Sequence, residues 1–173
     1  MKAGLGVGDK YFQVIREEYQ KRGEDFTALF QAILSVANEV GLDEALKYLE
    51  RCVIEKRLSW LGENLETLEK TGNPLADAYR YFYETYLGIS TPRDGEIVEK
   101  SDTRIVTRWW NHCPVLEACE KSGLDTREIC RKAYHRPVQV FLLQIDPKLR
   151  FDRNYDCLRP YTPYCEEIIT LEE

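Results

Sequence analysis

The stretch 95–110, GEIVEKSDTRIVTRWW, decides the fold class, because helical patterning gives way to strand patterning there. Glu96–Glu99 and Arg104–Trp110 flank a Ser101-Asp102 turn and alternate in side-chain character, which predicts a β-hairpin. The residues that share one face of the second strand are Ile105, Thr107 and Trp109. A hairpin that follows a helical first half predicts an α+β fold with an antiparallel sheet.

The sequence before this hairpin predicts helices, because apolar residues recur at three- and four-residue spacing. Asn73 followed by Pro74 is typical of an N-cap with proline at the first helical position. Gly62 is expected to interrupt the third helix. The predicted helices are Lys10–Arg22, Asp25–Gly41, Asp43–Leu68 and Asn73–Gly88.

The sequence after the hairpin predicts two short helices and two more strands. Pro114 opens a helix that Gly123 ends, and Asp125 caps the next helix, which Pro137 is expected to bend or restart. The predicted strands are Leu149–Cys157 and Tyr164–Leu171. We therefore expect one domain over 1–173, with a helical part at about 9–88 and a cysteine-bearing α+β part at about 95–173.

Composition excludes several classes of function. The 24 Lys and Arg residues are interleaved with 30 acidic residues, giving a net charge of −6, so nucleic-acid binding is not expected. The sequence contains neither the apolar run of a signal peptide nor the roughly 20 apolar residues of a membrane span. We expect a cytoplasmic protein without a membrane partner.

Four cysteines of the second half are predicted to form one site: Cys113, Cys130, Cys157 and Cys165. Cys113 precedes a helix, where unpaired N–H groups favour a thiolate, and Cys157 and Cys165 flank a turn between strands. Four thiolates suit Zn²⁺ or an iron–sulfur cluster, and ligand type alone does not choose between them. The spacing C-x16-C-x26-C-x7-C matches no common metal motif.

Competing interpretations of the cysteines and histidines remain open. Cys52 and Cys119 fall on apolar helix faces and are expected to be core thiols, although Cys119 could replace Cys130 as a ligand. His135 follows Cys130 by five residues and is a candidate ligand or acid–base group. His112 is a weaker candidate for the same role. Separate buried thiols, or two disulfides, are the alternatives to a metal site.

The last 65 or so residues carry a family resemblance. Cys113-Pro114, Gly123-Leu124, Cys130-Arg131, the run Ile145–Arg153 and Tyr164-Cys165 resemble the C-terminal half of the L-2-amino-thiazoline-4-carboxylic acid hydrolase-like proteins, especially a mostly prokaryotic branch with a further cysteine near Cys157. This superfamily is similar to the 4-vinyl reductase domains, which are small α+β domains that bind small molecules. The resemblance implies that the four cysteines occupy the family's cysteine positions.

Three functions follow as hypotheses. The first is a metal- or cluster-bearing domain that binds a small-molecule ligand or senses redox state. The second is a hydrolase of a cyclic C–N bond, with the Cys113 thiolate as nucleophile or a metal-bound water as attacking group, and His135 as proton carrier. The third is an interaction module with paired or buried cysteines. The Trp109-Trp110 pair is expected to lie either in the core or on the surface through which a homodimer forms.

Overall fold

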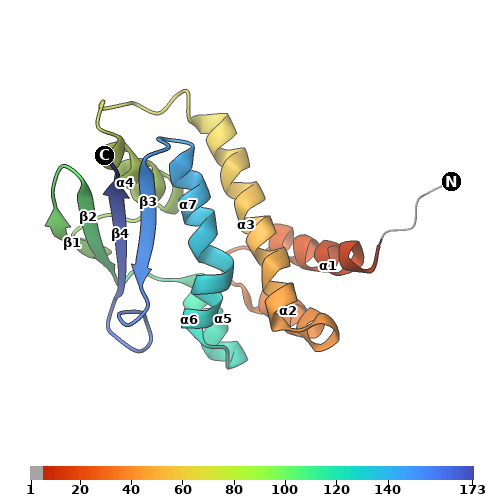
Figure 1. Cartoon of the computed structure of the whole chain (residues 1–173). Helices are drawn as coiled ribbons and strands as arrows, with labels where there is room; N and C mark the ends of the chain where they lie inside the picture. Colours follow the sequence, from red (N-terminus) through yellow and green to blue (C-terminus); the bar gives the residue numbers. More distant parts are fainter. Residues whose placement is uncertain (1–5) are drawn as a thin grey trace. The chain divides into compact units, whose positions relative to one another are not determined.

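The computed structural model describes residues 6–173 and has an α+β fold, as predicted (Figure 1). In chain order its elements are α1 (Val7–Lys21), α2 (Thr27–Val40), α3 (Leu42–Asn64), α4 (Pro74–Tyr79), the π-helix η1 (Arg80–Leu87), β1 (Gly95–Lys100), β2 (Arg104–Trp109), α5 (Pro114–Ser122), α6 (Thr126–Ile129), the π-helix η2 (Cys130–Tyr134), α7 (His135–Leu143), β3 (Leu149–Asn154) and β4 (Cys165–Leu171).

The chain forms two compact units, each built from two separate stretches. The first, which we call the helical unit, contains the described residues up to Glu55 and Cys113–Tyr134. The second, which we call the sheet unit, contains Lys56–His112 and His135–Glu173. That the whole chain behaves as one domain stays a prediction.

In the helical unit, α1 packs against α2, and α2 packs against α5. The Asp25 carboxylate accepts a hydrogen bond from the Thr27 N–H (2.8 Å) just before α2. Gly41 ends α2 with a φ of 89°, a value that favours glycine. The fully buried residues at the centre of this unit include Ile15, Phe30, Ile33, Leu46, Leu49, Cys119 and Ile129.

Gly62 and Pro137, the two residues expected to disturb helices, both lie within helices. Gly62 does not interrupt α3, which continues to Asn64, because glycine weakens a helix without removing its hydrogen bonds. Pro137 lies in the first turn of α7, directly after the π-helical segment η2. The chain stays helical over residues 126–143, so the bend or restart expected at Pro137 takes the form of a π-helical segment just before it rather than a break.

In the sheet unit, the four strands are antiparallel in the order β1-β2-β4-β3. Trp109 of β2 pairs with Gly95 of β1 on one side and with Cys165 of β4 on the other. The predicted hairpin is confirmed, with Ile105, Thr107 and Trp109 all buried. Figure 1 shows α7 running alongside β3, with which it is in contact. This buried face of the sheet positions the polar groups described below.

The fourth predicted helix, Asn73–Gly88, contains a run of aromatic residues that belongs to the core of the sheet unit. Tyr81, Phe82 and Tyr83 are at most 2% exposed, and they lie in the π-helix η1. Phe82 packs edge-to-face on Phe141 of α7, with ring centroids 5.2 Å apart. Packing rather than ligand stacking therefore accounts for this run.

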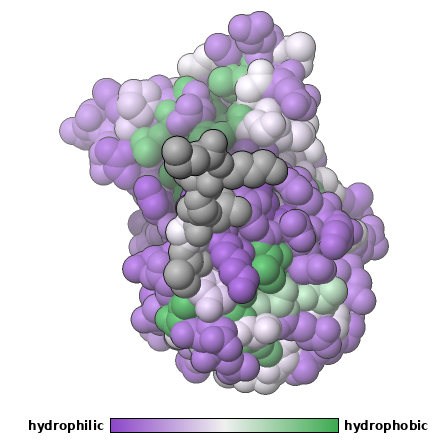
Figure 2. Space-filling view, turned by 90° about the vertical axis from the view of Figure 1, so that its right-hand side faces the viewer, coloured by the Kyte–Doolittle hydropathy of each residue, from purple (hydrophilic) through white to green (hydrophobic). Residues whose placement is uncertain are grey.

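The surface carries scattered apolar side chains. Figure 2 shows mostly hydrophilic residues on the visible face, with hydrophobic residues in small separate areas. Trp110 is 45% exposed, whereas Trp109 is 3% exposed, so the tryptophan pair is divided between surface and core. Within residues 6–173, no helix has both the length and the apolar character needed to cross a membrane.

Candidate thiol sites

The four cysteines predicted to converge are divided equally between the two units. Cys113 and Cys130 belong to the helical unit, whereas Cys157 and Cys165 belong to the sheet unit. All six cysteines of the chain lie in the described part, and none forms a disulfide there. One common four-cysteine site therefore stays a prediction.

Cys113 is the N-cap of α5, as the Cys113-Pro114 pair predicts. Its backbone is extended (φ −127°, ψ 108°), and its carbonyl accepts the Glu117 N–H (3.1 Å). The side chain is half-buried and does not itself cap the helix. The first N–H groups of α5 and its dipole favour negative charge at this position. Cys113 thus stands where a thiolate is favoured.

Cys113 and Cys130 each lie close enough to Cys119 for their charge to affect its pKa. Burial, followed by the negative charge of Cys130 and of Cys113, raises the pKa of the fully buried Cys119 thiol to about 12. Cys130 is half-buried at the junction of α6 and η2. Cys119 is a core thiol, as predicted, but it is also the centre of a group that we call the thiol cluster: Cys113, Cys119 and Cys130.

The thiol cluster is not arranged as a metal site in this conformation. Among residues 6–173, no group of three or more His, Cys, Asp and Glu side chains is placed to hold a metal ion. A structural Zn²⁺ site requires four ligands at roughly 2.0–2.3 Å in a tetrahedron. Binding of zinc or of an iron–sulfur cluster therefore stays a prediction.

Cys165 opens β4 in the sheet unit and interacts with Arg159 of the preceding loop. Its sulfur accepts the backbone N–H and the Nε–H of Arg159, both at 3.5 Å. Arg159 also donates from Nη1 to the Asn111 carbonyl (2.6 Å), which fixes the guanidinium beside the sulfur. Cys165 could be singled out from the sequence but its arginine could not, because the contact depends on how the loop returns to the end of β2.

Cys157 lies in the turn after β3. Its N–H donates to the Asn154 carbonyl (3.0 Å), and its own carbonyl accepts the Glu166 N–H (2.9 Å). Its half-buried side chain has no hydrogen bond of the kind seen at Cys165 among the described residues. The backbone of Cys157 thus closes the loop that carries Arg159.

His135 begins α7 and is held by two aromatic residues of the sheet unit. Its Nδ1 is 2.8 Å from the Tyr155 hydroxyl, and its ring packs edge-to-face on Phe151, with centroids 5.3 Å apart. Such a fixed ring suits a proton carrier. Cys130 belongs to the other unit, so the predicted partnership with His135 stays a prediction. His112 is exposed at the end of the hairpin.

A buried charged network crosses the sheet and was not predicted. Arg153 of β3 donates from Nη2 to Glu167 of β4 (2.8 Å), and the Tyr83 hydroxyl donates to the other carboxylate oxygen (2.8 Å). Burial, followed by the Glu167 charge, raises the pKa of Tyr83 well above its ordinary value. Arg153 and Glu167 are register partners, which strand alternation could have indicated once the pairing was known.

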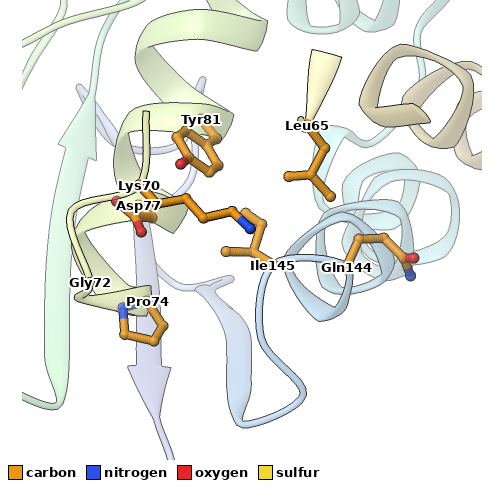
Figure 3. Close-up of a pocket in the computed structure, with 8 residues that line it drawn as sticks. All are labelled: Leu65, Lys70, Gly72, Pro74, Asp77, Tyr81, Gln144 and Ile145. Carbon is orange, nitrogen blue, oxygen red and sulfur yellow. The ribbon is translucent and has the colours of Figure 1, made fainter. Parts of the chain in front are cut away.

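A cavity of about 200 Å³ lies elsewhere in the sheet unit (Figure 3). Figure 3 shows the Lys70 side chain extending across it toward Ile145. Its acidic group, Asp77, accepts hydrogen bonds from the Thr71 N–H and hydroxyl (3.0 and 2.8 Å). Tyr81 donates to the Glu69 carbonyl (2.7 Å). These polar groups hold the loop before α4, and no cysteine or histidine lines the cavity.

Comparison with family models, curated proteins and solved structures finds no match to this chain.

Proposed function

We propose that this chain is a cytoplasmic redox sensor whose responsive group is the thiol cluster of the helical unit. The observation that supports this most directly is the electrostatic influence of both Cys113 and Cys130 on Cys119. The three cysteines of the cluster share the helical unit with Cys52, whose effect on the Cys119 pKa is not among the causes of its shift. A reducing cytoplasm would keep them as thiols until an oxidant appears.

The environments of the three thiols assign them different roles. Cys113 has the helix N-terminus that favours a thiolate, so it is the nucleophile. Cys119, with a pKa of about 12, stays protonated at neutral pH and is a poor nucleophile. Cys130 is half-buried and therefore accessible, so it is the second thiol of the reaction.

The reaction requires a hydroperoxide as oxidant. The Cys113 thiolate attacks one peroxide oxygen, the O–O bond breaks, and a sulfenic acid and hydroxide are formed. The Cys130 sulfur then attacks the sulfenic sulfur, an S–S bond forms, and water leaves. Two thiols are oxidised while one hydrogen peroxide is reduced to two waters. The new bond would connect the start of α5 to the end of α6.

Variants of single cysteines test these roles. The chain is treated with hydrogen peroxide, alkylated under denaturing conditions, and mapped by peptide mass spectrometry. In Cys113→Ser no disulfide should form. In Cys130→Ser the reaction should stop at a sulfenic acid on Cys113, which a 1,3-dione reagent captures.

Cys52→Ser is the matched control. Cys52 is buried, and its pKa is raised to about 11, chiefly by burial, so its removal should leave peroxide-driven disulfide formation unchanged. Disulfide formation that persists in Cys113→Ser would reject the assignment of the nucleophile. The absence of any oxidation at Cys113 and Cys130 in the unaltered chain would reject the proposed function.

A further inference from the structure

We propose that Cys165, Arg159 and Trp109 of the sheet unit form a binding site for the carboxylate of a small organic acid, with the Cys165 sulfur beside the bound acid. These three residues belong to the sheet unit, whereas the thiol cluster belongs to the helical unit. The proposed site is supported by a thiol held by an arginine, by unused positive charge on that arginine, and by a buried indole N–H without a partner.

The first observation is the contact between Cys165 and Arg159. The sulfur accepts the backbone N–H and the Nε–H of Arg159, each at 3.5 Å. Cys165 is half-buried rather than fully enclosed in the core. Hydrogen bonds from a cationic donor hold the sulfur in a fixed position at the start of β4.

The second observation is the charge balance of Arg159. Its Nε–H is directed at sulfur and its Nη1 at the Asn111 carbonyl, which leaves the Nη2 donors. Within residues 6–173, no carboxylate forms a salt bridge with this guanidinium. A guanidinium presents five N–H donors in a planar fork that matches a carboxylate. Arg159 therefore has both the charge and the donors to bind an organic acid.

The third observation is the indole of Trp109. Its Nε1–H is buried and has no hydrogen-bond partner in the part of the chain that the structure describes, and the residue is 3% exposed. A Cβ placed on Gly95 would lie 2.5 Å from Cε3 of this indole, so the six-membered ring covers β1. Gly95 and Cys165 are the partners of Trp109 on opposite sides. Because directly paired residues of antiparallel strands share a sheet face, the side chains of Trp109 and Cys165 are neighbours on that face.

The nearest acidic residue on the same sheet face does not oppose anion binding. Glu167 lies two residues after Cys165, and its carboxylate is neutralised by Arg153 and accepts the Tyr83 hydroxyl. A buried N–H donor without an acceptor costs roughly 1–3 kcal/mol. An acid oxygen that accepts from the Trp109 N–H and from Arg159 would remove that cost and balance the charge.

Iodoacetate and iodoacetamide distinguish this site from an ordinary accessible thiol. Both reagents form an S–C bond while the C–I bond breaks, iodide leaves, and the thiol proton passes to solvent. Only iodoacetate carries the carboxylate that Arg159 and Trp109 would bind. The measured quantity is the ratio of the two alkylation rates at each cysteine of the full native chain, read by peptide mass spectrometry with Cys157 as internal reference.

We expect the iodoacetate-to-iodoacetamide ratio at Cys165 to exceed that at Cys157 by about tenfold, the size of one good charge-assisted contact. Arg159→Gln should remove most of this preference, and Arg159→Lys should keep part of it. Trp109→Phe should lower it several-fold while retaining an aromatic ring. The matched control is the exposed neighbour variant Trp110→Phe, which should leave the ratio unchanged.

Circular dichroism of each variant separates loss of the site from loss of the fold. If Trp109→Phe does not fold, the Arg159 variants still decide the question, because Arg159 lies in a loop outside the core. Equal ratios at Cys165 and Cys157 in the unaltered chain would overturn the proposal. A Cys165 preference that survives Arg159→Gln would overturn it as well.

Discussion

At the scale of single residues, burial determines what each thiol can do. Cys119 and Cys113 lie six positions apart in sequence, yet one is fully buried and the other caps a helix with its backbone. Desolvation penalises a thiolate in the core, whereas a helix N-terminus favours it. The difference in environment, rather than the residue type, separates a core thiol from a reactive one.

The pKa of Cys119 leads to a prediction about alkaline stability. Its folded-state pKa of about 12 is above the ordinary value of 9.0. The protonated thiol therefore contributes stability that is fully present below pH 9 and is lost as the pH rises toward about 12. In urea unfolding, Cys119→Ala should lose less stability than the unaltered chain between about pH 8 and about pH 10.5.

The exposed Thr67→Ala variant, which removes no ionisable group, is the control for this titration. It should show the same dependence of unfolding free energy on pH as the unaltered chain. If Cys119→Ala also follows that dependence, the thiol does not titrate as described.

The buried ion pair Arg153–Glu167 leads to a prediction about the free energy of unfolding. The two side chains are 8% and 12% exposed, so removal of the carboxylate leaves a guanidinium without its counter-ion in a nearly dry site. Glu167→Ala should lower the unfolding free energy by about 3–5 kcal/mol. Tyr83→Phe removes one hydrogen-bond donor and should cost about 1 kcal/mol.

Glu99 provides the matched control for Glu167, since it also pairs with an arginine across the sheet. The Arg104–Glu99 pair is exposed (44% and 51%), so Glu99→Ala should change stability by less than about 1 kcal/mol. Both variants are measured by urea unfolding. Similar losses for Glu167→Ala and Glu99→Ala would contradict the importance of burial.

At the scale of elements, the close contact of β1 and β2 depends on Gly95. A Cβ there would lie 2.3 Å from the Arg108 carbonyl oxygen and 2.5 Å from Trp109 Cε3. Since backbone and a buried ring cannot both move aside, Gly95→Ala should destabilise the chain by about 2–4 kcal/mol. Thermal unfolding followed by circular dichroism measures this loss.

Gly62 gives the opposite expectation for the same substitution. It lies in α3, is exposed, and has no atom within 4 Å of the position where a Cβ would stand. Alanine is the better helix former, so Gly62→Ala should stabilise the chain by about 0.5–1 kcal/mol. A stabilising Gly95→Ala or a strongly destabilising Gly62→Ala would contradict these environments.

Most elements could be predicted from the sequence because their signals are local. The Asn73-Pro74 pair marks the start of α4, where Asn73 Oδ1 accepts the Leu75 and Ala76 N–H groups (3.0 and 3.3 Å). The Ser101-Asp102 turn marks the hairpin in the same way, whereas the register shift between Ile97 and Glu99 of β1 could not be predicted from it. The π-helices η1 and η2 were not predicted, because the i→i+5 pattern has no distinct apolar period in so short a segment.

At the scale of the whole molecule, the candidate sites depend on contacts between residues distant in sequence. Six cysteines could be singled out from the sequence, but not their division between two units built from interrupted stretches. The contact of Arg159 with Cys165 and the pairing of Arg153 with Glu167 follow from loop return and strand register. Neither is encoded in a local motif.

The measurement that tests the central claim most directly is the intact mass of anaerobically purified chain before and after about one equivalent of hydrogen peroxide. We expect the mass of the chain to fall by that of two hydrogen atoms. Peptide mapping should then find Cys113 and Cys130 joined in one cross-linked peptide. An unchanged mass would contradict the redox-sensor account, as would stoichiometric zinc or iron that protects Cys113, Cys130, Cys157 and Cys165 from the oxidant.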